Sequence, residues 1–363
     1  MAEVSQLQVE TALKEVIDPY LEQDLVSAKC VKKISVDGGK VVVDIVLGYP
    51  AKGSRDGLAA KLREKVATIP AVKDVVVNIS SKIGAHGVHK GVKPIDGVKN
   101  IIAVASGKGG VGKSTVSVNL ALALSAEGAN VGILDADIYG PSQPRMLGTH
   151  AKPETKDGHK MEPVMSYHLQ SMSIGYLIDE ETPMIWRGPM VTQALEQLLR
   201  DTNWQDLDYL VVDLPPGTGD IQLTLAQKVP VTGAVIVTTP QDIALLDARK
   251  GLKMFEKVEI PVIGIIENMS THICSQCGHE EHIFGAGGGL KMAEQYDVDF
   301  LGSLPLDLRI CADTDGGRPT VVADPEGRVA QIYREIARRV AGRLALMKKD
   351  FSAGFPNIVI QNT

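Results

Sequence analysis

Residues 107–115 of this chain read GKGGVGKST. From Gly107 to Ser114 it satisfies the pattern G-x-x-x-x-G-K-[ST], in which glycines let backbone N–H groups converge on phosphate oxygens. Residues 101–105 (IIAVA) before it have strand character, and residues 115–126 after it have helical character. The motif requires this order of strand, loop and helix, so we predict a phosphate-binding loop at a helix N-terminus.

Two side chains of the loop have specific expected roles. Lys113 should neutralise charge on the β- and γ-phosphates, and the Ser114 hydroxyl should ligate Mg²⁺. The alternative is a glycine-rich turn that merely joins a strand to a helix. The candidate nucleotide-binding residues of the loop are Gly107, Lys108, Gly109, Gly110, Val111, Gly112, Lys113, Ser114 and Thr115.

Carboxylates follow two further apolar runs. VGILDADIYGPS places Asp135 and Asp137 after one run, and YLVVDLPPGTGD places Asp213 after another. Residues at the carboxyl ends of parallel strands face the ligand crevice. We therefore expect Asp213 to hold Mg²⁺ through water and the backbone N–H of Gly217 to reach the γ-phosphate. Asp135 and Asp137 are candidates to orient or deprotonate the attacking water, and the alternative for all three aspartates is helix or turn capping.

Composition indicates a globular protein. The chain has 363 residues, of which 44% are hydrophobic and 23% charged. Its net charge of −6 gives no general attraction to nucleic acid or to anionic lipid. The N-terminus lacks the apolar core of a signal peptide, and no run approaches the roughly 20 apolar residues of a membrane span. We expect a cytoplasmic protein with neither nucleic acid nor membrane as partner.

The apolar patterning changes along the chain and predicts several regions. A small α/β domain (1–80) precedes a glycine- and lysine-containing linker (81–99), a large α/β domain (100–347) and a C-terminal tail (348–363). An extended loop within one domain is the alternative to the linker. The expected elements of the small domain are helices over 8–20 and 55–69 and strands over 40–47 and 72–79.

The large domain alternates short apolar runs with helical segments. Near-continuous apolar runs are typical of strands buried on both faces, so we predict a parallel sheet covered by helices. The last helix is expected over 327–347. The strand candidates are IIAVA (101–105), VGILD (131–135), YLVVDL (209–214), AVIVTT (234–239) and VIGII (262–266).

Four cysteines are too few for a disulfide framework, but Cys274 and Cys277 have CxxC spacing. Thiolates of this kind suit an iron–sulfur cluster or Zn²⁺. One pair supplies two ligands, and a symmetric dimer would supply four. His279 and His282 offer a rival zinc site within one chain, and redox chemistry or no metal is a third possibility. Cys30 and Cys311 are expected to be packing residues.

These motifs resemble those of the deviant Walker A ATPases, the group that includes MinD, ParA and the nitrogenase iron protein. The resemblance rests on the two lysines of GKGGVGKST, on DADIYGPS and on DLPPGTGD. Within that group, GPS (140–142), MIWRGPM (184–190) and the CxxC after ENMS (267–270) resemble the Mrp/ApbC branch of iron–sulfur cluster carriers. The likeness covers about residues 98–345.

The resemblance implies a doubly wound sheet and a homodimer as the working form. It implies that Lys108 reaches across the interface to the partner's ATP, that Asp137 assists hydrolysis and that Asn268 contacts the adenine. With Lys113, the expected catalytic residues are thus Lys108 and Asp137. It also implies a 4Fe-4S cluster bridged by Cys274 and Cys277 of both chains, and ATP with Mg²⁺ as further cofactors.

The implied function is a slow ATP hydrolase that takes a cluster from an assembly scaffold and delivers it to apoproteins. A positioning ATPase of the MinD or ParA type is the alternative, but it would need a basic amphipathic C-terminal helix or a DNA-binding patch, and 348–363 is neither. Residues 1–80 resemble the small domain of iron–sulfur assembly proteins. That domain often carries a cysteine beside a proline where this chain has GYPAKGS (48–54).

Overall fold

The computed structural model describes residues 4–88, 92–156, 158–178, 188–274 and 276–347. Part of the MIWRGPM motif and the whole tail after residue 347 therefore lie outside the described residues. Among the described helices, none is both long and apolar enough to cross a membrane.

An eight-stranded sheet forms the centre of the large domain, in the order β15-β12-β11-β6-β10-β7-β9-β8. Every neighbouring pair is parallel except β8 with β9. This confirms the predicted mostly parallel α/β sheet. The strands are β6 (Ile101–Ala105), β7 (Val131–Asp135), β8 (Val164–Ser166), β9 (Leu169–Ser173), β10 (Tyr209–Asp213), β11 (Gly233–Thr238), β12 (Val262–Glu267) and β15 (Asp299–Ser303).

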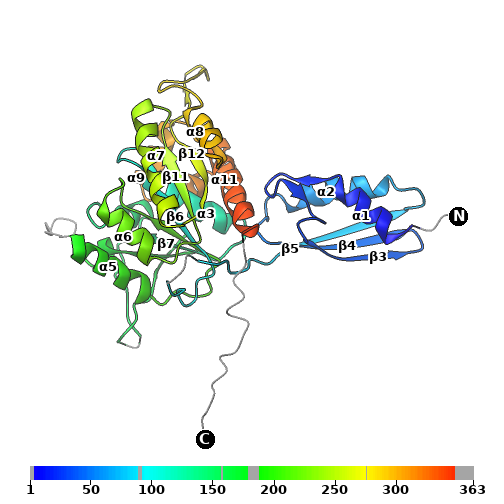
Figure 1. Cartoon of the computed structure of the whole chain (residues 1–363), viewed down its shortest axis with the longest axis horizontal. Coiled ribbons are helices and arrows are strands. Elements are labelled where there is room, and N and C mark those ends of the chain that lie inside the picture. The colour runs from blue at the N-terminus through cyan, green and yellow to red at the C-terminus, as the bar shows by residue number, and fades with distance from the viewer. Residues whose placement is uncertain (1–3, 89–91, 157, 179–187, 275, 348–363) are drawn as a thin grey trace, which may run out of the picture.

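Helices cover both faces of this sheet (Figure 1). α3 and α11 pack together in one apolar core, and α5 to α8 contribute to a second. Helices packed on both faces explain why β6, β7, β10 and β11 are buried throughout. The helices are α3 (Lys113–Ala126), α4 (Gln143–Met146), α5 (Gly188–Arg200), α6 (Asp220–Lys228), α7 (Asp242–Lys257), α8 (Gly288–Tyr296), α9 (Leu308–Asp315), α10 (Thr320–Ala323) and α11 (Arg328–Ala345), with a 3₁₀ turn at Ile174–Tyr176.

The N-terminal residues form a smaller unit around the sheet β3-β4-β5. The predicted strand over 40–47 is confirmed, but the helix expected over 8–20 ends at residue 14. Pro19 disfavours a helical conformation at residue 18, which instead pairs in a short hairpin. The elements are α1 (Gln6–Lys14), β1 (Ile17–Asp18), β2 (Gln23–Asp24), β3 (Val31–Asp37), β4 (Lys40–Leu47), α2 (Arg55–Ala67) and β5 (Asp74–Ser81).

A buried carboxylate, Glu127, joins the small unit to the large one. It follows the last residue of α3 and is 1% exposed. Its Oε1 accepts hydrogen bonds from Arg334 at 2.7 Å and Arg338 at 2.8 Å, both on α11. Its Oε2 accepts the backbone N–H of Gly53 at 2.8 Å, in the loop before α2. One apolar core continues from the small sheet onto α3 and α11, so the two units pack as neighbours.

Glu127→Ala should lower the free energy of unfolding by about 3–5 kcal/mol, because it removes the buried carboxylate that pairs with the guanidinium of Arg334 and leaves Arg338 with Glu335. Urea denaturation monitored by circular dichroism measures the change. Glu196→Ala is the matched control: Glu196 pairs with Lys228 on the surface, where an ion pair contributes less than about 1 kcal/mol. An equal decrease in the free energy of unfolding in the two variants would contradict the larger contribution expected of buried Glu127.

Candidate functional site

The phosphate loop connects β6 to α3 at the carboxyl edge of the sheet. Gly110 and Gly112 have φ values of +82° and +79°, a left-handed conformation that favours glycine. A Cβ on Gly112 would also lie 2.3 Å from the amide nitrogen of Asn268. That same amide donates to the carbonyl of Val111 at 2.9 Å. Asn268, expected beside the adenine, thus holds the loop backbone in its curled form.

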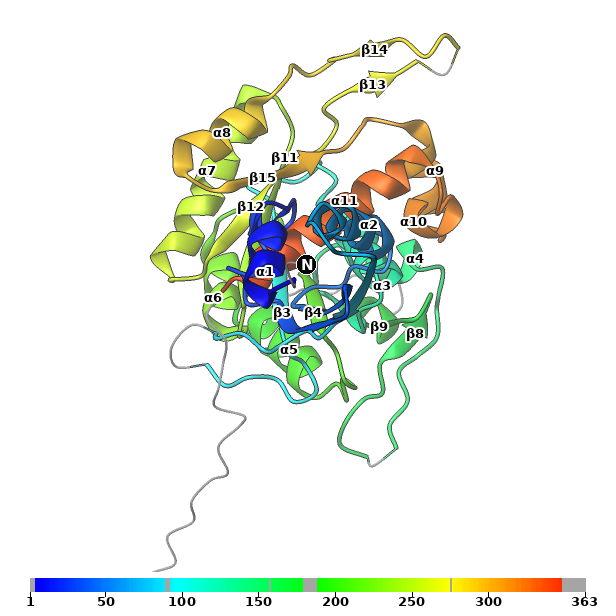
Figure 2. The same ribbon diagram turned by 90° about the vertical axis from the view of Figure 1, so that its right-hand side faces the viewer.

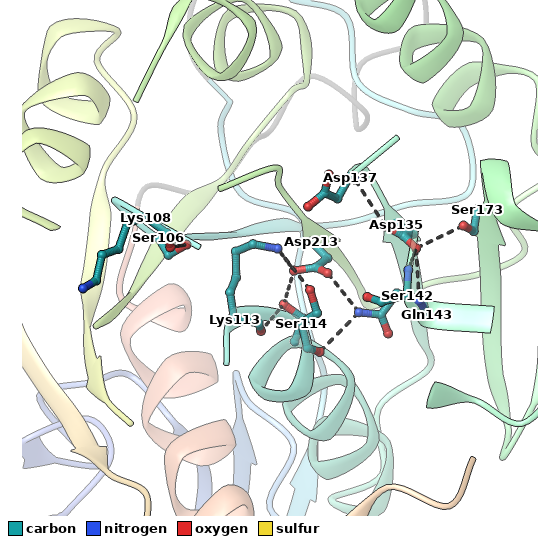
Figure 3. A network of polar contacts seen from close by, with 11 residues as sticks. Ser106, Lys108, Lys113, Ser114, Asp135, Asp137, Ser142, Gln143, Ser173 and Asp213 are labelled. Atoms are coloured by element: carbon teal, nitrogen blue, oxygen red, sulfur yellow. Dashed lines mark hydrogen bonds and ion pairs between the residues drawn. The ribbon is translucent and has the colours of Figure 1, made fainter. Parts of the chain in front are cut away.

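Lys113 is the first residue of α3, and its side chain is almost fully buried. Its Nζ lies 2.6 Å from Oδ1 of Asp213 and 3.3 Å from Oγ of Ser114. The hydroxyl of Ser117, one helical turn later, donates to the same Asp213 oxygen at 2.8 Å. The residues expected to bind phosphate and Mg²⁺ are therefore assembled at one point, with the charges of lysine and aspartate balanced (Figure 3).

Asp135 lies beside Asp213, because residues 135 and 213 are partners in the parallel pairing of β7 with β10. It is fully buried, and burial together with the Asp213 charge raises its pKa to about 7. Its carboxylate accepts hydrogen bonds from the backbone N–H groups of Asp137, Ser142 and Gln143 and from the hydroxyl of Ser173. These bonds fix the path of residues 137–143, so this geometry favours the capping alternative for Asp135 over direct contact with attacking water.

Asp137 lies on the Asp213 side of the phosphate loop, whereas Lys108 lies on the opposite side of Lys113 (Figure 3). Burial raises the pKa of Asp137, while the charge of Lys113 opposes that shift. Lys108 points away from Lys113 and Asp213. In this orientation the Lys108 ammonium group lies apart from the Lys113–Asp213 pair of its own chain. The backbone N–H of Gly217, expected to reach the γ-phosphate, donates to the carbonyl of Ser106 at 2.9 Å.

The cysteine pair lies on the hairpin formed by β13 (His272–Ile273) and β14 (Glu280–Glu281), which extends away from the body of the molecule (Figures 1 and 2). Cys274 is partly exposed and Cys277 is exposed. Hydrogen bonds from the backbone N–H groups of Gln276 and Cys277, and from the Cys277 side chain, lower the pKa of Cys274. A thiol whose thiolate is favoured at an exposed position is suited to ligate metal.

Within one chain the described residues form no group of three or more cysteine, histidine or carboxylate side chains that could hold a metal ion. Nδ1 of His282 lies 2.8 Å from the carbonyl oxygen of Ser270, which commits one ring nitrogen to the base of the hairpin. The rival Cys₂His₂ zinc site is therefore not assembled.

The expectation that Cys311 is a packing residue is wrong, because its side chain is exposed on α9 and lies 3.4 Å from Asp315.

Cys274 should react with iodoacetamide faster than Cys311 at pH 7, since the pKa of Cys274 is lowered and hydrogen bonding to Asp315 raises that of Cys311. The measurement is peptide mass spectrometry over a time course on the metal-free protein. The difference between the two rates should shrink as the pH is raised and the Cys311 thiol ionises. Equal rates at pH 7 would contradict the assignment.

Sequence reasoning missed two polar residues of the site, Ser117 and Gln143. Both contact Asp213, and Gln143 also binds the backbone of Ser114. The available signals were weak: Ser117 lies one helical turn after Lys113, and Gln143 follows the GPS segment. Neither position belongs to the phosphate-loop pattern, so only the fold reveals their contacts.

The winding of the sheet defines the class of the protein. From the central strand β6 the chain continues to β7, toward one edge of the sheet, and after β10 it continues to β11, toward the opposite edge. The phosphate loop follows β6, at the point where this direction changes. This is the fold and site of a P-loop NTPase. The nucleotide-binding protein from Archaeoglobus fulgidus, solved in complex with ADP, is similar, with a TM-score of 0.56 and 38% sequence identity over 64% of this chain and 90% of that one.

The family follows from sequence comparison. Residues 97–341 match the model of the ParA family described as NUBPL iron-transfer P-loop NTPases, and residues 6–79 match the iron–sulfur cluster assembly protein family. The chain belongs to the NUBPL iron-transfer P-loop NTPase family. It is 53% identical to the iron–sulfur cluster carrier protein of Escherichia coli K12 over 90% of this chain and 89% of that one. It is 52% identical to the iron–sulfur cluster transfer protein NUBPL of Mus musculus over 69% of this chain and 80% of that one.

Proposed function

We propose that the protein is an ATP-hydrolysing iron–sulfur cluster carrier that holds a 4Fe-4S cluster between two copies of the chain and transfers it to apoproteins. The observation that carries the proposal is the exposed hairpin with Cys274 and Cys277. It presents two thiols, one of them with a lowered pKa, and no third ligand from the described residues joins them. Four thiolates are the usual ligand set of a 4Fe-4S cluster.

A symmetric dimer completes that set. A two-fold axis beside the hairpin would bring the same two cysteines from each chain to one cluster. Projection of the hairpin away from the body leaves room for a second chain (Figure 2). Lys108 supports the same assembly, because it points away from its own phosphate site and a lysine in trans can neutralise charge at a partner's γ-phosphate.

ATP with Mg²⁺ fits the residues at the phosphate loop. Lys113 would bind the β- and γ-phosphates, Ser114 would ligate the cation, and Asp213 would hold its water ligands. The bound cation would neutralise developing charge during phosphoryl transfer. Asp137 is the proposed residue that orients the attacking water, since Asp135 is committed to the backbone of residues 137–143.

The names of the relatives support transfer of clusters to apo iron–sulfur proteins, with an assembly scaffold as donor. A cytoplasmic location is part of the proposal. So is the division into a small domain (1–80), a linker (81–99), an ATPase domain (100–347) and a tail (348–363). The small domain would dock donor or acceptor proteins rather than ligate a cluster, because its cysteine, Cys30, is buried.

The experiment is anaerobic reconstitution with iron and sulfide, followed by native mass spectrometry and by transfer to an apo-acceptor. The expected species is a mass of two chains plus one 4Fe-4S cluster, with the absorbance of such a cluster and gain of acceptor activity. Addition of a chelator that cannot reach protein-bound clusters controls for transfer through free iron. A colourless protein, or a cluster on a single chain, would overturn the proposal.

A further inference from the structure

Gln143, the first residue of α4, is a buried polar side chain beside the candidate Mg²⁺ site. It is 1% exposed. Its Nε2 donates to Oδ2 of Asp213 at 2.9 Å and to the carbonyl oxygen of Ser114 at 3.2 Å. Its backbone N–H donates to Asp135 at 3.0 Å. One residue therefore contacts both proposed magnesium residues and the loop that carries Asp137 (Figure 3).

The orientation of the carboxamide follows from its neighbours. A carboxylate oxygen and a carbonyl oxygen can only accept, so the end of the side chain that contacts both must be the NH₂ group. The oxygen Oε1 then faces elsewhere, and it is a buried acceptor with no hydrogen-bond partner among the described residues. Buried acceptors in native proteins are nearly always satisfied, which makes this atom a marker for a missing donor.

The chemistry of the site restricts what that donor is. Phosphate oxygens of ATP at neutral pH are acceptors and cannot satisfy a carbonyl oxygen. Lys113 is engaged by Asp213, and Ser117 donates to the same carboxylate. A water molecule bound to Mg²⁺ is a strong donor, and Mg²⁺ usually keeps several waters when it binds nucleotide.

We propose that Gln143 is a positioning residue for magnesium: Oε1 accepts a hydrogen bond from a Mg²⁺-bound water while Nε2 orients Asp213. This inference rests on the proposed use of Mg²⁺–ATP. Groups that orient metal ligands typically contribute 10- to 100-fold to metal affinity. Because Gln143 also binds Asp135 through its backbone, cation binding would be linked to the position of the loop that carries Asp137.

The test is the magnesium dependence of nucleotide binding by the full chain. Affinity for a fluorescent ATP analogue is measured by titration in EDTA and in saturating Mg²⁺, and Mn²⁺ affinity in the presence of ADP by electron paramagnetic resonance. Gln143→Met keeps the length of the side chain and removes both polar atoms. It should leave affinity in EDTA almost unchanged, reduce the gain from Mg²⁺ by about tenfold, and weaken Mn²⁺ binding by a similar factor.

Gln170→Met is the matched control. Gln170 binds the backbone of Gln205 and pairs with Gly132 at the opposite end of the strands from Asp135. In this variant Mg²⁺ should increase the nucleotide affinity by the same factor as in the native chain. If Gln143→Met does not fold, Gln143→Asn serves instead, because it keeps an amide but withdraws it by one methylene, and it should also show a reduced gain.

The outcomes separate this inference from the proposed function. A native chain whose nucleotide affinity is the same in EDTA and in Mg²⁺ would overturn the proposed use of Mg²⁺–ATP together with the role of Gln143, whereas the cluster experiment tests the carrier function separately. If Mg²⁺ raises the nucleotide affinity of the native chain and raises that of Gln143→Met or Gln143→Asn by the same factor, the role of Gln143 alone would be overturned. A purely structural role predicts equal losses in EDTA and in Mg²⁺, which is likewise against the inference.

Discussion

Lys108→Ala should reduce ATP hydrolysis by roughly 10³-fold while leaving ATP affinity nearly unchanged. A cation supplied in trans to the γ-phosphate acts mainly on the transition state, and an arginine finger of that kind contributes about 10³- to 10⁵-fold. The structure provides the geometric reason: Lys108 points away from Lys113 and Asp213, so its removal leaves the phosphate site of its own chain intact (Figure 3). Single-turnover hydrolysis and equilibrium binding measure the two quantities separately.

Two controls sharpen this prediction. Lys250→Ala removes a surface lysine that pairs with Asp247 on α7, and it should hydrolyse ATP at the native rate. Mixing Lys108→Ala with a chain in which Lys113 is replaced should restore part of the activity, because the mixed dimer contains one complete site made from two chains. Equal losses of affinity and hydrolysis in Lys108→Ala would place the lysine in its own chain's site instead.

Cys277→Ser should abolish retention of the cluster. Each chain contributes two thiolates, so the substitution removes half of the four ligands from a symmetric site at once. Because Cys277 is exposed at the tip of the hairpin, the free energy of unfolding of the metal-free protein should not change. Iron and sulfide content, absorbance after anaerobic reconstitution and thermal unfolding provide the three measurements.

Cys311→Ser is the matched control for that experiment. Its thiol is also exposed, but its pKa is raised by Asp315, so it should not contribute a ligand. The variant is expected to retain a full cluster. A normal cluster content in Cys277→Ser, or its loss in Cys311→Ser, would contradict the assignment of ligands to the hairpin.

The fold was predictable from the sequence where local patterns and burial agree. Strands buried on both faces leave near-continuous apolar runs. Strand β6 begins and ends as expected, at residues 101 and 105, and the phosphate loop that follows it sets its end. The apolar runs did not predict strands β8, β9 and β15 of the large sheet or strand β3 of the small one. Strand β3 mixes lysine and serine with apolar residues and is only partly buried, so periodicity alone does not identify it.

The site was predictable as far as its motifs extend. The loop pattern identifies Lys113 and Ser114 because their chemistry requires fixed spacing. The role of Asp135 depends on contacts with Ser142 and Ser173, and the position of Gln143 depends on how α4 packs beside α3. Such contacts join residues from different elements, and no spacing within the chain encodes them.

Helix α11 has a consequence for the study of shortened chains. Its first residue, Arg328, pairs with Glu280 on the cysteine hairpin, and its last turns contact the small domain. There the Arg338 guanidinium lies 5.3 Å from the ring of Tyr20, and a Cβ on Gly342 would lie 2.5 Å from the Tyr20 carbonyl oxygen. Deleting the small domain would remove Tyr20 and expose this surface of α11 to solvent. A truncated ATPase would therefore differ in solubility and in the support that α11 gives to the cysteine hairpin, as well as in any binding of partner proteins by the small domain.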